Sequence, residues 1–273
     1  MEALKDLLKN QTTPLALSSS ICDQHGAKQV NLIQFEGEEI CPICERERNN
    51  ELLSQKETEK IYQAHASKAH KAFTKQSILT DTGLYKASFS TYEVQEPEEV
   101  ANKEKAIMAF KRYKEGEIFN TWFTGLPAVG KSHLAMSILR NLNEAGDKDK
   151  CCLFVSVDEM LRKIRGSFDN RESIYTENYF VDLLSGADFL VLDDLGAETG
   201  ATGSNKTATD FTLRVLYAIS NARQNKPTIV TSNLSKAELV KMYDAKLVSR
   251  LMKDTYLIRF DETSDKRIKN IEF

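Results

Sequence analysis

The fold of this chain is decided by residues 117–139, EIFNTWFTGLPAVGKSHLAMSIL. Residues 117–124 are typical of a buried strand and residues 133–139 of a helix, and Gly-x-x-x-x-Gly-Lys-Ser lies between them. A strand, a glycine-rich loop and a helix in this order are the context that a P-loop requires. The alternative is a chance glycine-rich turn before a helix, which the flanking strand and helix disfavour. The sequence therefore predicts an ATP-binding P-loop domain.

The chemistry of this loop assigns a role to each kind of residue in it. Glycines let successive backbone N–H groups point at phosphate oxygens, and the following helix adds its positive N-terminal end. We expect Lys131 to reach the β- and γ-phosphates and the Ser132 hydroxyl to bind Mg²⁺. The predicted nucleotide-binding residues of the loop are Gly125, Pro127, Ala128, Val129, Gly130, Lys131, Ser132 and His133.

A second apolar strand, residues 188–192, runs directly into two adjacent acids, Asp193 and Asp194. Ligands of a parallel sheet lie outside the carboxyl ends of its strands, so both acids are expected at the phosphate site. Asp193 is predicted to hold Mg²⁺, and Asp194 to orient or deprotonate the attacking water. The alternative is an acid pair that caps a helix, which the upstream P-loop disfavours.

A third strand, residues 226–232, ends at Asn233. Asn233 is predicted to hydrogen-bond the attacking water or the γ-phosphate, and the alternative is that it caps the helix expected over residues 236–243. From about residue 77 onward, apolar strands alternate with helical patterns. This alternation predicts βαβ units and an α/β fold with a parallel sheet.

The N-terminal region carries two pairs of metal-binding residue types, 15 residues apart. Cys22 and His25 form one pair, and Cys41 and Cys44 form the other. Pairs at this spacing can close one tetrahedral zinc site, and four protein ligands make such a site structural. Residues 30–35 between the pairs are expected to form a short hairpin strand. The alternative is that the two pairs are unrelated.

The chain is expected to divide into a zinc-binding domain over residues 1–48, a linker helix over 49–76 and an ATPase domain over 77–273. The linker sequence is highly charged and has a thin apolar face, so His65 and His70 on it are expected to be solvated. Cys151 and Cys152 open a strand and are expected in the core. The acidic residues 93–99 are expected to form a solvated loop before a helix over 102–114.

Composition bounds the remaining function classes. The formal net charge is -3, with 28% charged and 41% hydrophobic residues. This balance argues against a strongly basic nucleic-acid coat protein and is sufficient for a buried α/β core. No apolar run reaches the roughly 18 residues that span a bilayer, and the N-terminus lacks the pattern of a signal peptide. We therefore expect a cytoplasmic protein without a membrane partner, in which disulfides are disfavoured.

The order of these motifs resembles that of AAA+ ATPases. After the P-loop come LDDLGAE over residues 192–198, TIVTSNL over 228–234 and VSRL over 248–251. The resemblance covers roughly residues 77–265 and is strongest to bacterial and phage replicative helicase loaders of the DnaC/DnaI type. IstB-like transposase helpers share the same core. The resemblance implies a three-layer α/β AAA+ domain.

The resemblance also implies roles for single residues. Asn233 matches the first sensor, and Arg250 matches the arginine finger that reaches the ATP of a neighbouring subunit. The alternative for Arg250 is a solvated arginine on a helix. Either Lys266 or Arg267 matches the second sensor. Only 13 residues follow Phe260, so no full C-terminal lid is expected.

A helicase loader is the function that the resemblance implies. Its expected partners are a DnaB-type hexameric helicase, single-stranded DNA and further copies of itself, and its cofactors are ATP or ADP, Mg²⁺ and Zn²⁺. The zinc region favours a loader, because DnaI-type loaders carry an N-terminal zinc domain that grips the helicase. Transposase helpers begin with a helical region without zinc, and a transposition-targeting ATPase stays the alternative.

A surface for single-stranded DNA is suggested by bases and aromatic residues after the strand over residues 153–157. A groove that combines positive charge with stacking rings suits a single strand. The alternative is a set of solvated helix residues. Residues 199–206 are rich in small residues and are expected to form a mobile loop. The candidate DNA-binding residues are Arg162, Lys163, Arg165, Phe168, Tyr175 and Tyr179.

Overall fold

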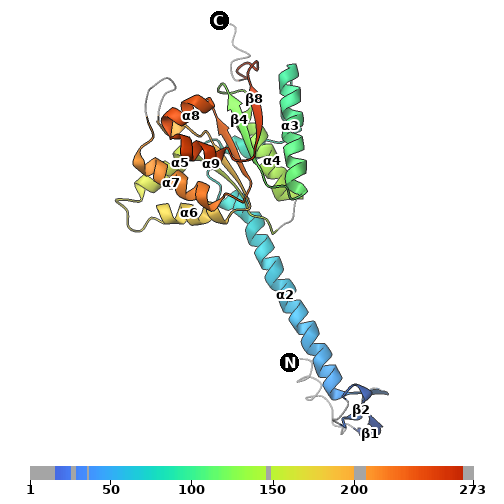
Figure 1. Ribbon diagram of the computed structural model, residues 1–273. Helices are drawn as coiled ribbons and strands as arrows, with labels where there is room; N and C mark the ends of the chain where they lie inside the picture. Colours follow the sequence, from blue (N-terminus) through green and yellow to red (C-terminus); the bar gives the residue numbers. More distant parts are fainter. Residues whose placement is uncertain (1–15, 26–28, 36, 146–148, 200–206, 267–273) are drawn as a thin grey trace. The chain divides into compact units, whose positions relative to one another are not determined.

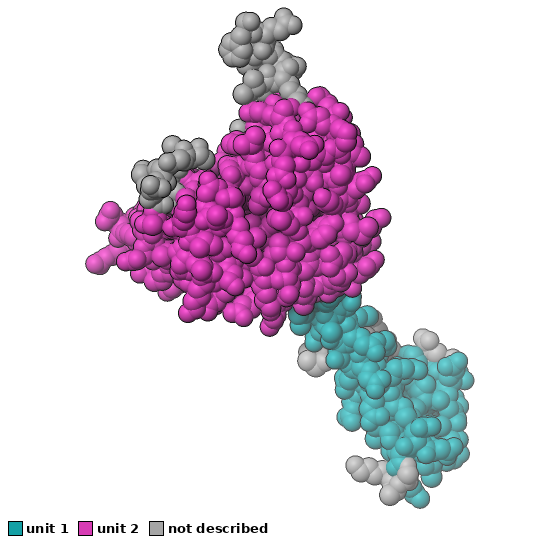
Figure 2. Space-filling view, turned by 45° about the horizontal axis from the view of Figure 1, so that its top comes forward, with its two compact units in different colours: residues 1–64 teal, residues 65–273 magenta. Residues whose placement is uncertain are grey.

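The computed structural model describes residues 16–25, 29–35, 37–145, 149–199 and 207–266. The chain divides into two compact units, residues 1–64 and residues 65–273, which Figure 2 draws in teal and magenta. The predicted loop over 199–206 falls almost entirely outside the described residues. Within the described part of the chain, no helix combines the length and apolar character that crossing a membrane requires.

The first unit contains a small antiparallel sheet of three strands in the order β1-β2-β3. The strands are β1 (Ala16–Ile21), β2 (Asn31–Phe35) and β3 (Glu38–Ile40), and the 3-10 turn η1 (Asp23–His25) follows β1. The strand expected over residues 30–35 is thus present as β2. A sheet this small buries little apolar area, so the unit needs a further source of stability.

Helix α2 (Pro42–Lys75) begins earlier than the linker helix expected over residues 49–76. Proline is favoured at the start of a helix because its missing N–H has no helical partner there. The expected boundary between residues 48 and 49 therefore falls inside a helix, and Cys44 lies in the first turn of that helix.

The buried residues of α2 are confined to its last turns, and these residues belong to the second unit: Ala66, Ala69, Ala72 and Phe73. His65 is exposed, as expected. The expectation of a solvated His70 is wrong. His70 is half-buried, and its Nδ1 lies 3.0 Å from the Asn143 carbonyl oxygen.

The second unit is built on a sheet of five parallel strands in the order β5-β6-β7-β4-β8. This is the parallel α/β arrangement that the sequence predicted. The first predicted strand begins at Asn120 instead of residue 117, and Ile118 before it is 59% exposed. The strands are β5 (Cys152–Ser156), β6 (Phe189–Asp193), β7 (Thr228–Ser232), β4 (Asn120–Gly125) and β8 (Thr255–Phe260).

Helices cover both faces of this sheet, so the unit has three layers (Figure 1). Successive strand residues point to opposite faces. Trp122 packs with α5, α6, α7, α8 and α9 on one face, while Phe123 packs with α3 and α4 on the other. The helices are α3 (Pro97–Lys114), α4 (Lys131–Ala145), α5 (Val157–Gly166), α6 (Glu177–Gly186), α7 (Asp210–Ala222), α8 (Lys236–Met242) and α9 (Ala245–Leu251).

The acidic segment before α3 is not the solvated loop that its charge suggested. Helix α3 begins at Pro97, and Glu96 and Glu99 form a reciprocal capping box at its start. The Glu99 side chain is fully buried. The core assignment of Cys152 agrees with the structure, whereas Cys151 is only half-buried.

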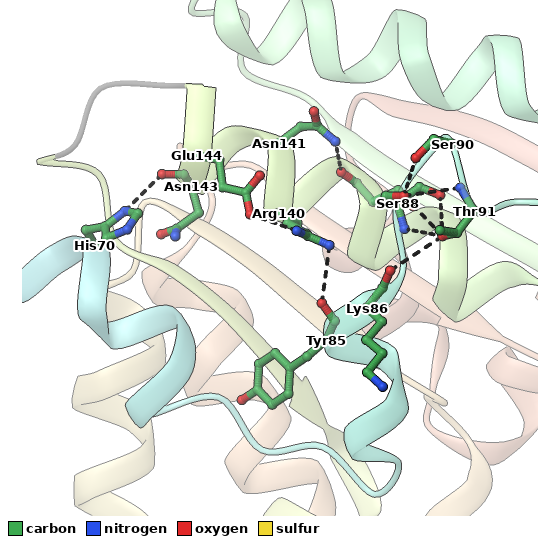
Figure 3. A network of polar contacts seen from close by, with 11 residues as sticks. His70, Tyr85, Lys86, Ser88, Ser90, Thr91, Arg140, Asn141, Asn143 and Glu144 are labelled. Atoms are coloured by element: carbon green, nitrogen blue, oxygen red, sulfur yellow. Dashed lines mark hydrogen bonds and ion pairs between the residues drawn. The ribbon is translucent and has the colours of Figure 1, made fainter.

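The segment between α2 and α3 crosses the sheet edge and then binds α4. Ile78 pairs with the backbone of edge strand β5, and the 3-10 turn η2 (Thr82–Lys86) follows. Figure 3 shows Arg140 of α4 reaching the Tyr85 carbonyl oxygen at 3.4 Å, close to a cluster of hydroxyl groups at Ser88, Ser90 and Thr91. Tyr92 of this segment donates its hydroxyl proton to the Val129 carbonyl oxygen of the P-loop at 3.3 Å.

Candidate functional site

The P-loop connects β4 to α4 at the carboxyl edge of the sheet, and its glycines are required by close neighbours. Gly125 has a φ of 142°, and an added Cβ would lie 2.4 Å from the Phe260 carbonyl oxygen. Gly130 has a φ of 96°, and its added Cβ would lie 2.6 Å from the ring of Tyr92. Ala128 also has a positive φ, of 59°. The loop therefore holds a curled backbone of the kind that turns N–H groups toward an anion.

Lys131 opens α4 and is 4% exposed. Its ammonium donates hydrogen bonds to the Gly125 carbonyl oxygen at 2.9 Å and to the Leu126 carbonyl oxygen at 2.5 Å. The charge is therefore held over the loop in which phosphate oxygens would lie.

Asp193, at the end of β6, lies beside Ser132 of the P-loop, whose hydroxyl favours the ionised form of its carboxylate. Burial and the neighbouring Asp194 raise the pKa of Asp193 to about 6, against the opposing effects of Ser132, Thr231 and Lys131. A buried carboxylate beside a hydroxyl is a donor set that Mg²⁺ accepts, and a bound cation would stabilise the ionised acid.

Thr231 on β7 ties the two acids together, and sequence reasoning missed it. Its hydroxyl donates to Asp193 Oδ1 at 2.7 Å and accepts the Asp194 N–H at 2.9 Å. Asp194 has a φ of 55°, a left-handed conformation that is strained for a side chain other than glycine. The hydroxyl thus fixes a backbone turn that directs the two carboxylates differently. A threonine two residues before Asn233 was the available signal.

Asn233 directly follows β7, whose neighbours in the sheet are β6 and β4. The helix α8 that follows is capped by Ser235, whose hydroxyl accepts the Glu238 N–H. Helix capping therefore does not explain Asn233, and its side chain is half-buried at the same sheet edge as the P-loop.

Lys266 reaches the P-loop with its backbone, because its N–H donates to the Ala128 carbonyl oxygen at 3.1 Å. Its ammonium lies 3.1 Å from the buried Glu99 carboxylate and 4.1 Å from the centre of the Tyr92 ring. Burial raises the pKa of Glu99, but the Gln95 amide and Lys266 together bring it below its ordinary value. Lys266 therefore joins α3 to the loop, and Arg267 lies outside the described residues.

His133, in the first turn of α4, faces the segment before α3. Its Nε2 lies 3.0 Å from the Ser88 carbonyl oxygen, and its ring packs edge-on against Tyr92 at 5.4 Å. Burial lowers the pKa of His133. Sequence reasoning placed His133 at the nucleotide but missed Tyr92, which supports the loop from 38 residues before Gly130.

Arg250 lies at the opposite edge of the sheet from the P-loop. The end of its helix α9 is held at the start of β4, where Asn120 Nδ2 donates to the Leu251 carbonyl oxygen at 3.3 Å. The P-loop follows the far end of β4. Five residue steps of about 3.3 Å separate the two ends of that strand by roughly 17 Å. The arginine is thus not part of the nucleotide site of its own chain.

A separate cluster in the first unit brings together Cys22, His25, Cys41 and Cys44. One ligand atom from each of the four lies within 4.8 Å of the others. Cys22 Sγ lies 3.7 Å from Cys44 Sγ, and Cys44 Sγ lies 3.2 Å from His25 Nε2. Four atoms about 2.3 Å from one Zn²⁺ in a tetrahedron lie about 3.8 Å apart, so these residues fit a zinc site.

The cysteine thiols of this cluster shift the pKa values of one another. Burial, followed by Cys22 and Cys41, raises the pKa of Cys44 to about 12. Burial also opposes ionisation of Cys41, but the Cys44 and Ile43 amides overcome it and lower that pKa to about 7. A metal ion would relieve the repulsion among the thiolates. Cys22 and His25 follow β1 and Cys41 follows β3, so the small sheet and the start of α2 assemble the ligands.

No family model matches this chain, but several curated proteins share sequence with it. The replicative helicase loader DnaC of Escherichia coli K12 is 26% identical over 211 residues, which are 74% of this chain and 79% of that protein. The replicative helicase loader DnaC of Buchnera aphidicola from Acyrthosiphon pisum is 31% identical over 137 residues. That second match spans 48% of this chain and about half, 52%, of the relative.

Solved structures agree on the fold. A crystal structure of DnaI covers 70% of this chain and 96% of its own length, with a TM-score of 0.54 and 22% identity. At this identity the likeness concerns the fold alone, which is the α/β AAA+ fold. The chain thus shares its fold with the solved DnaI structure and sequence with the two DnaC proteins.

Proposed function

We propose, on the premise that this chain is a homologue of the DnaC-type replicative helicase loaders, that it uses ATP to place a hexameric replicative helicase on single-stranded DNA. One observation carries the proposal. The meeting of Lys131, Ser132 and Asp193 at the carboxyl edge of an AAA+ sheet is the arrangement that Mg²⁺-ATP requires. We further propose that ATP binding and hydrolysis control assembly with the helicase and release from it.

In this proposal each catalytic residue has one task. Lys131 neutralises the phosphates, Ser132 and Asp193 hold Mg²⁺, and Asn233 orients the attacking water from the adjacent strand. Asp194, held in its left-handed turn by Thr231, orients or accepts a proton from that water. Mg²⁺, held by Ser132 and Asp193, would offset the negative charge of the phosphates.

Lys131→Ala and Asp194→Asn are expected to separate ATP binding from hydrolysis. Lys131→Ala removes the charge held over the loop, so ATP affinity should fall. Asp194→Asn keeps the shape of the side chain, so ATP should still bind while turnover falls by about 10²-fold or more. The measurements are titration with a fluorescent ATP analogue and steady-state phosphate release. An equal loss of ATP affinity in both variants would show that these roles are misassigned.

The first unit is proposed to bind the helicase. Apolar side chains on it are exposed to solvent, including Leu17 at 74% and Ile21 at 46% on β1, and Leu52 and Leu53 at 46% each on α2. Exposed apolar side chains on so small a unit suit binding to another protein. The deciding experiment is direct binding to the purified hexameric helicase. A chain that bound a transposase and not the helicase would instead be a transposition-targeting ATPase.

A basic and aromatic surface after β5 is proposed to contact single-stranded DNA. Lys163 lies 4.7 Å above the ring of Tyr175, and Arg165 lies 5.5 Å from the ring of Phe211. Phe168 packs edge-on against Phe211 yet stays 61% exposed. A ring that is held on one side and open on the other can stack a base. Arg162 and Lys163 are both paired with Glu159, and Tyr179 packs on Phe180, so Phe168 is the side chain of this surface that is best placed to meet a base.

Phe168→Ala is expected to weaken binding to single-stranded DNA by about 1–3 kcal/mol, the usual value of one stacked base. Fluorescence anisotropy with a labelled oligo-dT at two salt concentrations measures the loss. Tyr62→Ala is the matched control, because Tyr62 is a ring of similar exposure, 49%, in the other unit. Equal affinities of the two variants for the oligonucleotide would remove Phe168 from the DNA surface.

A further inference from the structure

The loop that follows Asp194 is tied to α8 by a hydrogen-bonded carboxylate that no step of ATP hydrolysis requires. Glu198 lies in the 3-10 turn η3 (Ala197–Thr199), and its Oε2 accepts the Gly196 N–H at 2.9 Å. Its Oε1 accepts the hydroxyl proton of Tyr243, which directly follows α8 and is 3% exposed. One carboxylate therefore joins the loop of the second acid to the residue between α8 and α9.

The same loop is packed tightly against the segment between β7 and α8. Gly196 has a φ of 105°, and an added Cβ would lie 2.5 Å from the Leu234 side chain. Leu195 in the same loop is also bonded to β7, because its N–H donates to the Thr231 carbonyl oxygen at 2.9 Å and its carbonyl oxygen accepts the Ser232 hydroxyl at 2.7 Å. Through the Glu198–Tyr243 hydrogen bond, a shift of the Asp194 loop would move the end of α8.

The residue after Tyr243 is in turn hydrogen-bonded to α9, the helix that carries Arg250. Asp244 caps α9, and its Oδ1 accepts the Leu247 N–H at 2.7 Å. The carboxylate also accepts the Tyr217 hydroxyl at 2.8 Å. The Arg250 guanidinium lies 5.3 Å from the centre of the Tyr217 ring.

The arginine itself is held in a position that leaves hydrogen-bonding capacity unused. Its Nη1 is buried and finds no acceptor among the residues that the structure describes. A buried donor without an acceptor is costly, so a position that offers an anionic acceptor would be favoured over this one. Arg250 in this structure therefore packs over the Tyr217 ring with one buried N–H group unsatisfied among the described residues.

We propose that Glu198 and Tyr243 are positioning residues that couple the nucleotide state of one subunit to the arginine which that subunit offers to its neighbour. The loop of Asp194 responds to the bound nucleotide, the Glu198–Tyr243 bond transmits its position to α8 and α9, and Asp244 with Tyr217 sets the pose of Arg250. This inference rests on the proposed function, because it requires ATP hydrolysis in an assembly with Arg250 acting between subunits.

The test uses two kinds of full-length subunit in one assembly. The donor carries Asp194→Asn, so it binds ATP and offers Arg250 but does not hydrolyse. The acceptor carries Arg250→Ala, so it has an intact site and no arginine. Hydrolysis in the mixture then reports only the acceptor site served by the donor arginine. Tyr243→Phe, which removes one hydroxyl, is introduced into the donor or into the acceptor.

We expect Tyr243→Phe in the donor to lower hydrolysis by roughly tenfold, within the usual range of coupling between sites, and to have little effect in the acceptor. ATP affinity should stay unchanged in both. Glu198→Gln in the donor should give a smaller loss than Glu198→Leu, because the amide can still accept from one of the two donors. Tyr113→Phe is the matched control, since it removes another buried tyrosine hydroxyl, bonded to Thr121.

If Tyr243→Phe lowers hydrolysis equally in the donor and in the acceptor, Tyr243 has a purely structural role and the inference is overturned. Unchanged hydrolysis with either placement would overturn it as well. If the mixture without Tyr243→Phe shows no hydrolysis, Arg250 does not act between subunits. The proposed coupling through Glu198 and Tyr243 then fails as well. A failure of the Glu198–Tyr243 coupling and a failure of the proposed function thus give different results.

Discussion

Arg250→Ala is expected to lower ATP hydrolysis by the assembled protein by about 10³-fold or more, the usual contribution of an arginine finger. ATP affinity of a single subunit should stay nearly intact. The physical reason is the position of α9, which is fastened to the start of β4 through Asn120 while the P-loop follows its end. The guanidinium can therefore stabilise transition-state charge only at the site of another subunit.

Mixing experiments separate action between subunits from action within one. Arg250→Ala mixed with Lys131→Ala should regain part of the activity, because one interface then pairs an intact site with an intact arginine. Arg214→Ala is the matched control, since that arginine is 63% exposed and paired with Glu177 on the surface. If hydrolysis does not depend on protein concentration, helicase or DNA, and mixing restores nothing, Arg250 does not act between subunits.

Cys41→Ser is expected to abolish zinc binding and unfold the first unit while ATP binding survives. The intact chain should hold close to one zinc ion, and the variant close to none. The loss is large because structural zinc contributes on the order of 10–16 kcal/mol of apparent binding free energy in zinc-finger peptides. The sheet of β1, β2 and β3 has little core to replace it. Helicase binding should be lost together with the metal.

Elemental analysis, circular dichroism and titration with an ATP analogue check this expectation. Cys151→Ser is the matched control, because Cys151 is a half-buried cysteine in the second unit, far in sequence from the cluster. Removing the metal with a chelator should reproduce the effect of Cys41→Ser without a substitution. A metal-free chain that stays folded and still binds the helicase would contradict the structural zinc site.

The sequence predicted most accurately those features that depend on neighbours along the chain. The P-loop lies between a strand and a helix as expected, because its spacing and its glycines describe a local backbone shape. The cluster of candidate zinc ligands was likewise predictable from two short pairs. Where the prediction was wrong, residues distant in the sequence were responsible. Glu99 was expected in a solvated loop but is buried against Lys266, 167 residues later.

By itself, the sequence determined the parallel α/β class, the P-loop between its strand and helix, the two acids after β6 and the four candidate zinc ligands, because each rests on periodicity or close spacing. Only the tertiary structure decided that Thr231 holds both acids, that Tyr92 supports Gly130, and that Glu198 joins the Asp194 loop to Tyr243. The physical reason is that a buried hydrogen bond depends on where two strands or helices meet. No local pattern encodes that meeting, so neither member of such a pair stands out in the chain.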